Sequence, residues 1–182
     1  MLMVATKYSG FSLIENVIAI CLMGLLMISF SSLLAPQAVQ TADTLTQQRY
    51  SQIATLLLQE MYSRPFDEQN IDNVDRCDAG SCSATETFGQ GQDAGEQVND
   101  TGILIRDDFD DYATNSAFEP ITSFGLGFAG PYQDFEVRID VEYVDDSWAS
   151  VASGATATKH AIITLRKGAT TETQFNAYRS NY

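Results

Sequence analysis

The most conspicuous pattern in the chain is a long apolar run near its N-terminus. From Val17 to Ala35 there are 19 consecutive residues without a charge. As an α-helix this run would be about 28 Å long, close to the thickness of the hydrocarbon core of a bilayer. A cleaved secretory signal has a shorter apolar core of about 7–15 residues. The run therefore predicts a membrane-spanning helix, with a buried helix of a soluble protein as the alternative.

The helical pattern continues beyond Pro36. Apolar residues recur there at intervals of 3, 4 and 8 positions, with polar residues between them: Ala38, Ala42, Leu45, Ile53, Leu57 and Met61. Arg64-Pro65 marks the expected end, because the residue before a proline avoids the helical conformation. The sequence thus predicts a transmembrane helix over 11–35 that continues as an amphipathic helix over 36–64.

The last part of the chain, residues 135–182, has the pattern of β-strands. Phe135–Val144 strictly alternates apolar with charged residues, as in a half-buried strand. His160–Lys167 and Thr171–Arg179 are predicted to form two more strands, joined by a turn at Gly168-Ala169-Thr170. A long helix with an antiparallel sheet laid on its second half is the simplest packing of these elements. The predicted fold class is therefore α+β.

The segment between helix and strands, residues 65–134, is rich in acidic residues, Gly and Asn, and predicts loops with a short strand near Gly102–Arg106. The whole chain has 182 residues, with 24 Asp and Glu against 10 Lys and Arg, and a net charge of −14. Residues 67–146 contain 20 of the acids and only three arginines. Such a charge excludes a nucleic-acid binder, since little is available to neutralise phosphates.

One short motif precedes the apolar run directly: Gly10-Phe11-Ser12-Leu13-Ile14-Glu15. This motif in this context resembles the processing site of type IV prepilins and pseudopilins. The resemblance implies that a prepilin peptidase removes residues 1–10 as a leader, cutting after Gly10, and methylates the new N-terminal Phe11. It also implies a pilin-like fold and a structural, non-enzymatic subunit. The proline that the family usually has in this helix would fall near Ser32, whereas this chain has Pro36.

Glu15 is the acidic residue of that motif. A carboxylate near the bilayer edge is costly unless it is paired or reaches head-group water, so it is a candidate functional residue. The resemblance implies that Glu15 pairs with the methylated amine of a neighbouring subunit during assembly. The partners it implies are prepilin peptidase, other major and minor pilin subunits, the inner-membrane assembly platform and the lipid bilayer.

The charge flanking the apolar run predicts its orientation. Lys7 lies before the run and the next basic residue, Arg49, lies well beyond it. The positive-inside rule then predicts a single-pass inner-membrane protein with a cytoplasmic N-terminus and a periplasmic C-terminal domain. The resemblance implies a later position in a pilus fibre at the cell surface.

Three further segments resemble a minor pilin of the mannose-sensitive haemagglutinin (MSHA) pilus. They are Arg64-Pro65-Phe66-Asp67-Glu68, Asp107-Asp108-Phe109-Asp110-Asp111-Tyr112 and Phe175-Asn176-Ala177-Tyr178-Arg179-Ser180-Asn181-Tyr182. An adhesive or binding module on the filament, acting through the acidic loops, is the alternative function. Neither enzyme-like motif fits its context. Asp100-Thr101-Gly102 lacks a second triplet, and Gly125-x-Gly127-x-x-Gly130 is followed by Pro131 instead of a helix.

The cysteines divide by position. Cys21 lies in the apolar run, while Cys77 and Cys82 lie in the part predicted to be periplasmic. In that oxidising compartment the pair predicts a disulfide that closes a short loop. Zinc is the alternative, but two thiols and the distant His160 do not complete a tetrahedral site. His160 itself is expected to be a surface or packing residue.

A cluster of four aspartates offers the one candidate metal site: Asp107, Asp108, Asp110 and Asp111. Calcium prefers six to eight oxygen ligands on a flexible loop, and several relatives of the resembled family have such a loop. The calcium-loop spacing of EF-hands is absent. The alternative is a solvated acidic face, and no other cofactor is expected.

Overall fold

The computed structural model describes residue 10 and residues 12–72, 76–77, 81–89, 105–168 and 172–181. It divides into two compact units, Met1–Gln47 and Gln48–Tyr182. Phe11 and most of the predicted strand near Gly102–Arg106 lie outside the described residues. Ile105 and Arg106, which are described, are not in a strand.

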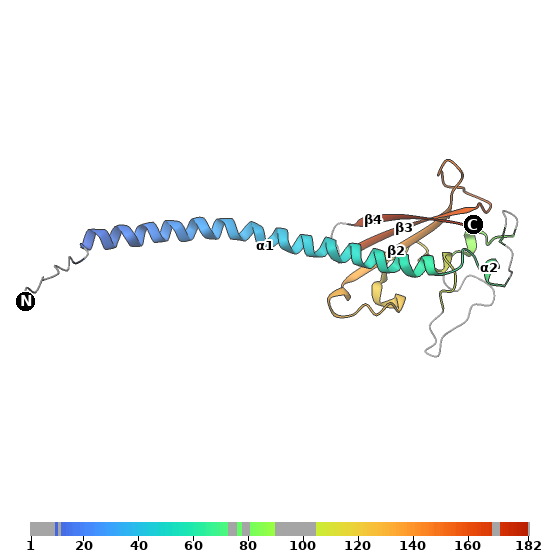
Figure 1. Ribbon diagram of the computed structural model, residues 1–182, viewed down its shortest axis with the longest axis horizontal. Coiled ribbons are helices and arrows are strands. Elements are labelled where there is room, and N and C mark those ends of the chain that lie inside the picture. Colours follow the sequence, from blue (N-terminus) through green and yellow to red (C-terminus); the bar gives the residue numbers. More distant parts are fainter. Residues whose placement is uncertain are drawn as a thin grey trace, which may run out of the picture. The chain divides into compact units, whose positions relative to one another are not determined.

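The first element is a single long helix, α1, which covers Leu13–Ser63 and has 51 residues (Figure 1). It begins where the carbonyl of Ser12 accepts hydrogen bonds from the backbone N–H groups of Glu15 and Asn16, at 3.1 and 3.2 Å. It ends directly before Arg64-Pro65, as predicted. The helix continues through Pro36, although proline has no N–H to donate to the preceding turn.

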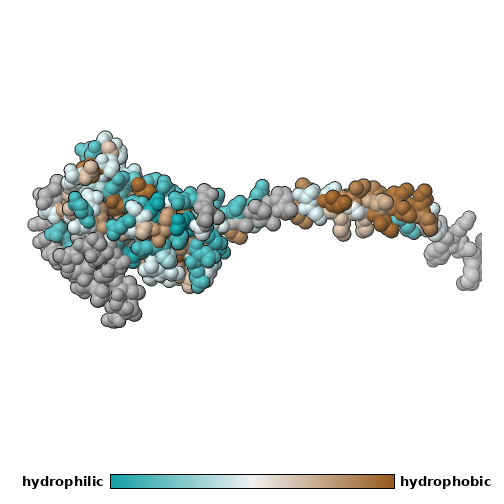
Figure 2. Space-filling model, turned by 180° about the vertical axis from the view of Figure 1, so that it is seen from behind, coloured by the Kyte–Doolittle hydropathy of each residue, from teal (hydrophilic) through white to brown (hydrophobic). Residues whose placement is uncertain are grey.

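The apolar span of α1 in the first unit covers Leu13–Leu34, with a mean hydropathy of 2.5, and none of it is buried by the chain itself. Figure 2 shows this span as a mostly hydrophobic surface. The hydroxyls of Ser29 and Ser31 donate to carbonyls one turn earlier in the helix, both at 2.9 Å. Such bonds satisfy the polar side chains without water. By length and composition this is the one helix in the described part of the chain that can cross a membrane.

The second unit contains a four-stranded antiparallel sheet in the order β1-β2-β3-β4. The strands are β1 Glu119–Pro120, β2 Phe135–Tyr143, β3 Thr158–Lys167 and β4 Thr173–Ser180. The three longer strands match the predicted ones within two residues. Ile139 pairs with Ile163 across β2 and β3, and Ile163 pairs with Phe175 across β3 and β4.

The core of this unit forms between the last turns of α1 and one face of the sheet. Ile53, Leu57 and Met61 are fully buried, as their spacing predicts. The tyrosine ring of Tyr50 packs edge-on against Phe135 of β2, with ring centroids 5.3 Å apart. The α+β fold is therefore confirmed. Leu45, placed on the same stripe by the sequence, lies in the first unit and is 49% exposed.

The acidic region before β2 is more ordered than predicted. Besides β1, the described residues of this region form the short helix α2 (Gln69–Asp72) and four 3₁₀ turns, at Thr85–Thr87, Asp110–Tyr112, Ile121–Phe124 and Gly130–Tyr132. Several of its aromatic residues belong to the core, since Phe109, Tyr112, Phe124 and Phe128 are buried. Irregular backbone in this region therefore contributes apolar surface to the unit.

Adjacent leucines on α1 test this packing. Leu57 is fully buried, whereas Leu56 is 45% exposed. We expect Leu57→Ala to lower the free energy of unfolding by about 2–5 kcal/mol, because it leaves a cavity in the core. Leu56→Ala should change it by less than about 0.5 kcal/mol. Chemical denaturation of the detergent-solubilised chain measures both, and equal effects would contradict the proposed packing face.

Candidate assembly segment and buried ionic cluster

Two of the residues predicted for processing and assembly, Gly10 and Glu15, lie just before α1 and in its first turn. Gly10 is exposed and precedes the helix, and Phe11 lies outside the described residues. Glu15 lies in the first turn of α1 and is exposed. A negative charge is favourable at this end of a helix, where the backbone N–H groups are unpaired. Glu15 is also the only charged residue between Leu13 and Leu34.

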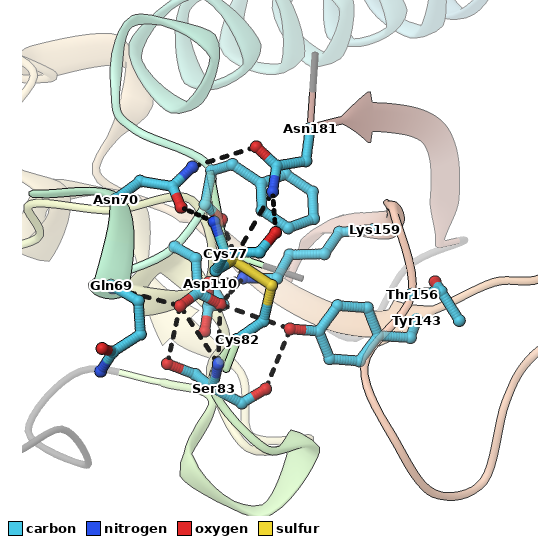
Figure 3. Close-up of a disulfide and its surroundings, with 12 residues drawn as sticks. Gln69, Asn70, Cys77, Cys82, Ser83, Asp110, Tyr143, Thr156, Lys159 and Asn181 are labelled. Carbon is cyan, nitrogen blue, oxygen red and sulfur yellow. Dashed lines mark hydrogen bonds and ion pairs between the residues drawn. A yellow bond between two sulfur atoms is a disulfide. The ribbon is translucent and has the colours of Figure 1, made fainter. Parts of the chain in front are cut away.

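The disulfide predicted between Cys77 and Cys82 is present, with the two Cα atoms 5.0 Å apart (Figure 3). The side chain of Asn70 accepts a hydrogen bond from the backbone N–H of Cys77 at 3.0 Å. Asn181, after β4, donates to the carbonyl of Cys77 at 2.9 Å, and its side-chain oxygen accepts a hydrogen bond from the amide of Asn70 at 3.0 Å. The disulfide loop is therefore fastened to the C-terminal strand. Cys21 is an exposed free thiol on α1.

The disulfide also argues against zinc binding by Cys77 and Cys82. Within the described ranges, the one group of three potential metal ligands is Asp67 with Cys77 and Cys82. Both sulfurs of this group are bonded to each other, so neither is a thiolate ligand. His160 is not part of the group. Its two ring nitrogens lie 2.9 Å from Glu142 and 2.9 Å from Asn176, which makes it a packing residue of the sheet surface, as expected.

Beside the disulfide lies a buried cluster of charged side chains around Lys159, the second residue of β3. Lys159 has no exposed surface. Its ammonium donates to the carbonyl of Phe66 at 2.8 Å and to Oδ2 of Asp67 at 2.9 Å, and it directly contacts Oδ1 of Asp110. Three aromatic rings surround it, with centroids 4.5, 4.9 and 5.4 Å from the nitrogen: Phe66, Phe88 and Tyr143.

Asp67 is the most extensively hydrogen-bonded member of this cluster. Its carboxylate accepts from the backbone and hydroxyl of Ser83, from the backbone of Gln69 and from the hydroxyl of Tyr143. Burial opposes ionisation of Asp67, but the Lys159 charge and these hydrogen bonds outweigh it and hold the pKa below its usual value. Asp67 is therefore an ionised carboxylate in the folded protein.

Aspartates of the predicted calcium site accept hydrogen bonds from the backbone of their own segment. Oδ1 of Asp108 accepts from the backbone of Asp110 and Asp111, at 2.9 and 3.0 Å. Oδ2 of Asp111 accepts from the backbone of Asp107 and Asp108, at 2.9 and 3.2 Å. Because Asp108, Asp110 and Asp111 are buried, the expectation of a solvated acidic face is wrong. Buried carboxylates also give no support to an adhesive role for this cluster, and calcium stays a prediction.

Asp108 is the aspartate that burial disturbs most. Removal from water, and then the neighbouring charge of Asp110, raise its pKa to about 9 despite the opposing charge of Lys159. At neutral pH the side chain is therefore protonated. Its Oδ1 still accepts two backbone hydrogen bonds in that state.

Sequence reasoning missed the Lys159 cluster. One signal was available: in a strand, residues two apart share a face, and Lys159 precedes Ala161, Ile163 and Leu165 on the buried face of β3. A lysine in that series indicates a buried cation, which needs an acidic partner. The acidic partners of Lys159 could not be predicted from the sequence, because Asp67 and Asp110 lie 92 and 49 residues away from it.

No protein-family model, curated protein or solved structure matches this chain. The function is therefore argued from the motif, the exposed span and the fold.

The raised pKa of Asp108 predicts a pH dependence of stability. The folded state keeps this proton up to about pH 9, while the unfolded state loses it above about pH 4. Stability therefore falls as pH rises between these values, by up to about 1.4 kcal/mol per pH unit for one proton. Asp108→Asn keeps the side-chain oxygen that caps the turn but has no proton to lose.

We expect Asp108→Asn to stabilise the protein relative to the wild type at pH 8 and to do so much less at pH 5. Denaturation of both proteins at the two pH values measures this difference. The exposed Asp134 provides a matched control, and Asp134→Asn should show no such trend. A gain that is the same at both pH values would contradict a protonated Asp108.

Proposed function

We propose that this chain is a minor pilin or pseudopilin, a structural subunit that is made as a membrane-anchored precursor and assembled into a type IV-like filament. One observation carries the proposal. The span Leu13–Leu34 is entirely exposed, and it begins in the middle of the Gly10–Glu15 motif with one acidic residue in its first turn. No catalytic role is proposed.

Cleavage after Gly10 gives the chain a new ammonium group at Phe11, four residues before Glu15. Within an apolar layer either charge alone is costly. Pairing the amine of one subunit with Glu15 of its neighbour removes both penalties, and the apolar helices pack at the same time. An unpaired charge disfavours other alignments, so the pair specifies the register between subunits.

The disulfide supports the proposed location of the second unit. Disulfides persist in oxidising compartments such as the periplasm and are rare in the cytosol. With Lys7 before the span, we propose a cytoplasmic N-terminus in the precursor and a periplasmic second unit. Prepilin peptidase, the assembly platform of the inner membrane and other pilin subunits are the proposed partners.

A finer assignment, to the minor pilins of the MSHA pilus, rests on the three segments that begin at Arg64, Asp107 and Phe175. Two of these segments supply Asp67 and Asp110, the carboxylates that contact Lys159. A shared structural role of this kind gives a physical reason for such segments to resemble one another among related subunits.

Mass spectrometry of the mature N-terminus tests the proposed processing. In cells that contain prepilin peptidase, we expect the chain to begin with N-methyl-Phe11. In matched cells without the peptidase, the precursor should keep residues 1–10. A chain that still begins at Met1 in the presence of an active peptidase would refute the proposal.

A second test concerns Glu15. We expect Glu15→Val to insert into the membrane normally but to reduce incorporation into filaments about tenfold or more, since the neighbouring amine would lose its partner in an apolar layer. Asp43→Val is the matched control, because Asp43 is another exposed acid on α1, outside the apolar span. Immunoblots of sheared filaments and of membranes measure both quantities. Equal incorporation of the two variants would remove Glu15 from the assembly mechanism.

A further inference from the structure

The cluster around Lys159 places an amine against a carboxyl group where water is excluded. The side chains of Lys159, Asp67 and Asp110 have no exposed surface. The nitrogen of Lys159 directly contacts Oδ1 of Asp110, and Oδ2 of Asp67 lies 2.9 Å from the same nitrogen. Figure 3 shows Lys159 and Asp110 converging beside the disulfide. An amine, a carboxyl group and a second carboxylate in mutual contact are the components of an amide-forming site.

We propose that Lys159 and Asp110 become joined by an isopeptide bond that the folded chain forms by itself, with Asp67 as the proton carrier. The product is an amide between Nζ of Lys159 and Cγ of Asp110. The inference rests on these buried contacts and is independent of the proposed role in a filament.

The reaction needs no other reactant. The ammonium of Lys159 passes one proton to the carboxylate of Asp110 across their contact, which leaves a neutral amine and a neutral acid. The amine attacks Cγ, and the N–C bond forms. Asp67 takes a proton from that nitrogen and passes it to the hydroxyl on Cγ, whose C–O bond breaks as water leaves. One ammonium and one carboxylate thus become one amide and one water, and Asp67 ends as it began.

Two features of the surroundings favour this reaction. Burial removes the hydration that stabilises the separated charges in water, so the neutral amine and acid become more accessible. Contact in a folded protein also replaces an encounter in solution, which for well-oriented groups corresponds to effective concentrations of about 10⁵–10⁸ M. The rings of Phe66, Phe88 and Tyr143 line the nitrogen and keep water from reversing the bond.

The contacts also distinguish the two carboxyl groups. The charge of Lys159 and the hydrogen bonds that Asp67 accepts from Ser83 and Gln69 favour its ionised form, and Tyr143 donates a further hydrogen bond. An ionised carboxylate is a poor target for an amine but a good proton acceptor. Asp110 lies in a 3₁₀ turn and is the group in direct contact with the nitrogen. We therefore assign Asp110 as the acceptor of the bond and Asp67 as the base.

The intact mass of the purified full chain in detergent tests this inference. After reduction of the disulfide and complete denaturation, we expect the chain to be lighter than its sequence by the mass of one water molecule. A mass equal to that of the unmodified sequence would show that the cluster is only an ion pair and would overturn the inference.

Digestion with trypsin locates the bond. Cleavage at Arg106, Arg138 and Arg166, with no cleavage at a blocked Lys159, should release residues 107–138 joined to residues 139–166 as one branched product. The unlinked chain would instead give 139–159 and 160–166 as separate peptides. Loss of water confined to a linear peptide, or a branch at Asp67, would overturn the assignment.

Four variants complete the test. Lys159→Met and Asp110→Ala should restore the full mass, and Asp67→Asn should reduce the linked fraction at least tenfold. Asp108→Asn is the matched control, because it changes a buried aspartate of the same turn and should remain linked. A linked Asp110→Ala chain would exclude Asp110 as the acceptor, and a fully linked Asp67→Asn chain would exclude Asp67 as the carrier. The mass of the wild-type chain can overturn the inference by itself. The test therefore does not depend on whether every variant folds.

Discussion

Burial of one stripe of α1 against the apolar face of the sheet is the interaction on which the second unit depends. Ile53, Leu57 and Met61 supply the helix side of this contact, and β2 and β3 supply alternate residues from the other side. The aromatic residues of the acidic region complete the same core. Hydrophobic burial is non-directional, so it explains why these elements associate but does not by itself fix how the loops are held.

Polar contacts in the otherwise apolar interior hold the loops in specific positions. Lys159 and its aspartates occupy positions that apolar side chains would fill at lower desolvation cost. In return, the ammonium joins β3 to the segments around Phe66 and Asp110, which are remote in sequence. The disulfide and the amides of Asn70 and Asn181 fasten the adjacent loop to the end of β4. Irregular segments are thus held in one arrangement by bonds with specific geometry.

Much of the fold was readable because its signals are local. Alternation along Phe135–Tyr143 identified β2 and its buried face, and Arg64-Pro65 identified the end of α1. The Cys77–Cys82 pair followed from the compartment that the apolar span predicts. The exposure of Leu45 could not be predicted from such local signals. The spacing of apolar residues shows which face of a helix is apolar, but not whether another element covers that face.

The interior use of the aspartates was equally unreadable from their spacing. The sequence offered a solvated acidic face as the alternative to a calcium site at residues 107–111, whereas tertiary contacts bury Asp108, Asp110 and Asp111 together with Asp67. The acid-rich sequence therefore overstates the surface charge of the folded protein, since two of these groups contact Lys159 and the pKa of Asp108 is raised to about 9.

The tie between Asn181 and the disulfide loop has a consequence for the order of events during synthesis. The apolar span of α1 emerges from the ribosome early, whereas β4 and Asn181 follow only after the rest of the second unit. Synthesis of the span therefore precedes completion of the sheet. The disulfide loop therefore receives this hydrogen bond only after β4 has been made, and its fixed position depends on a residue 104 positions further along the chain.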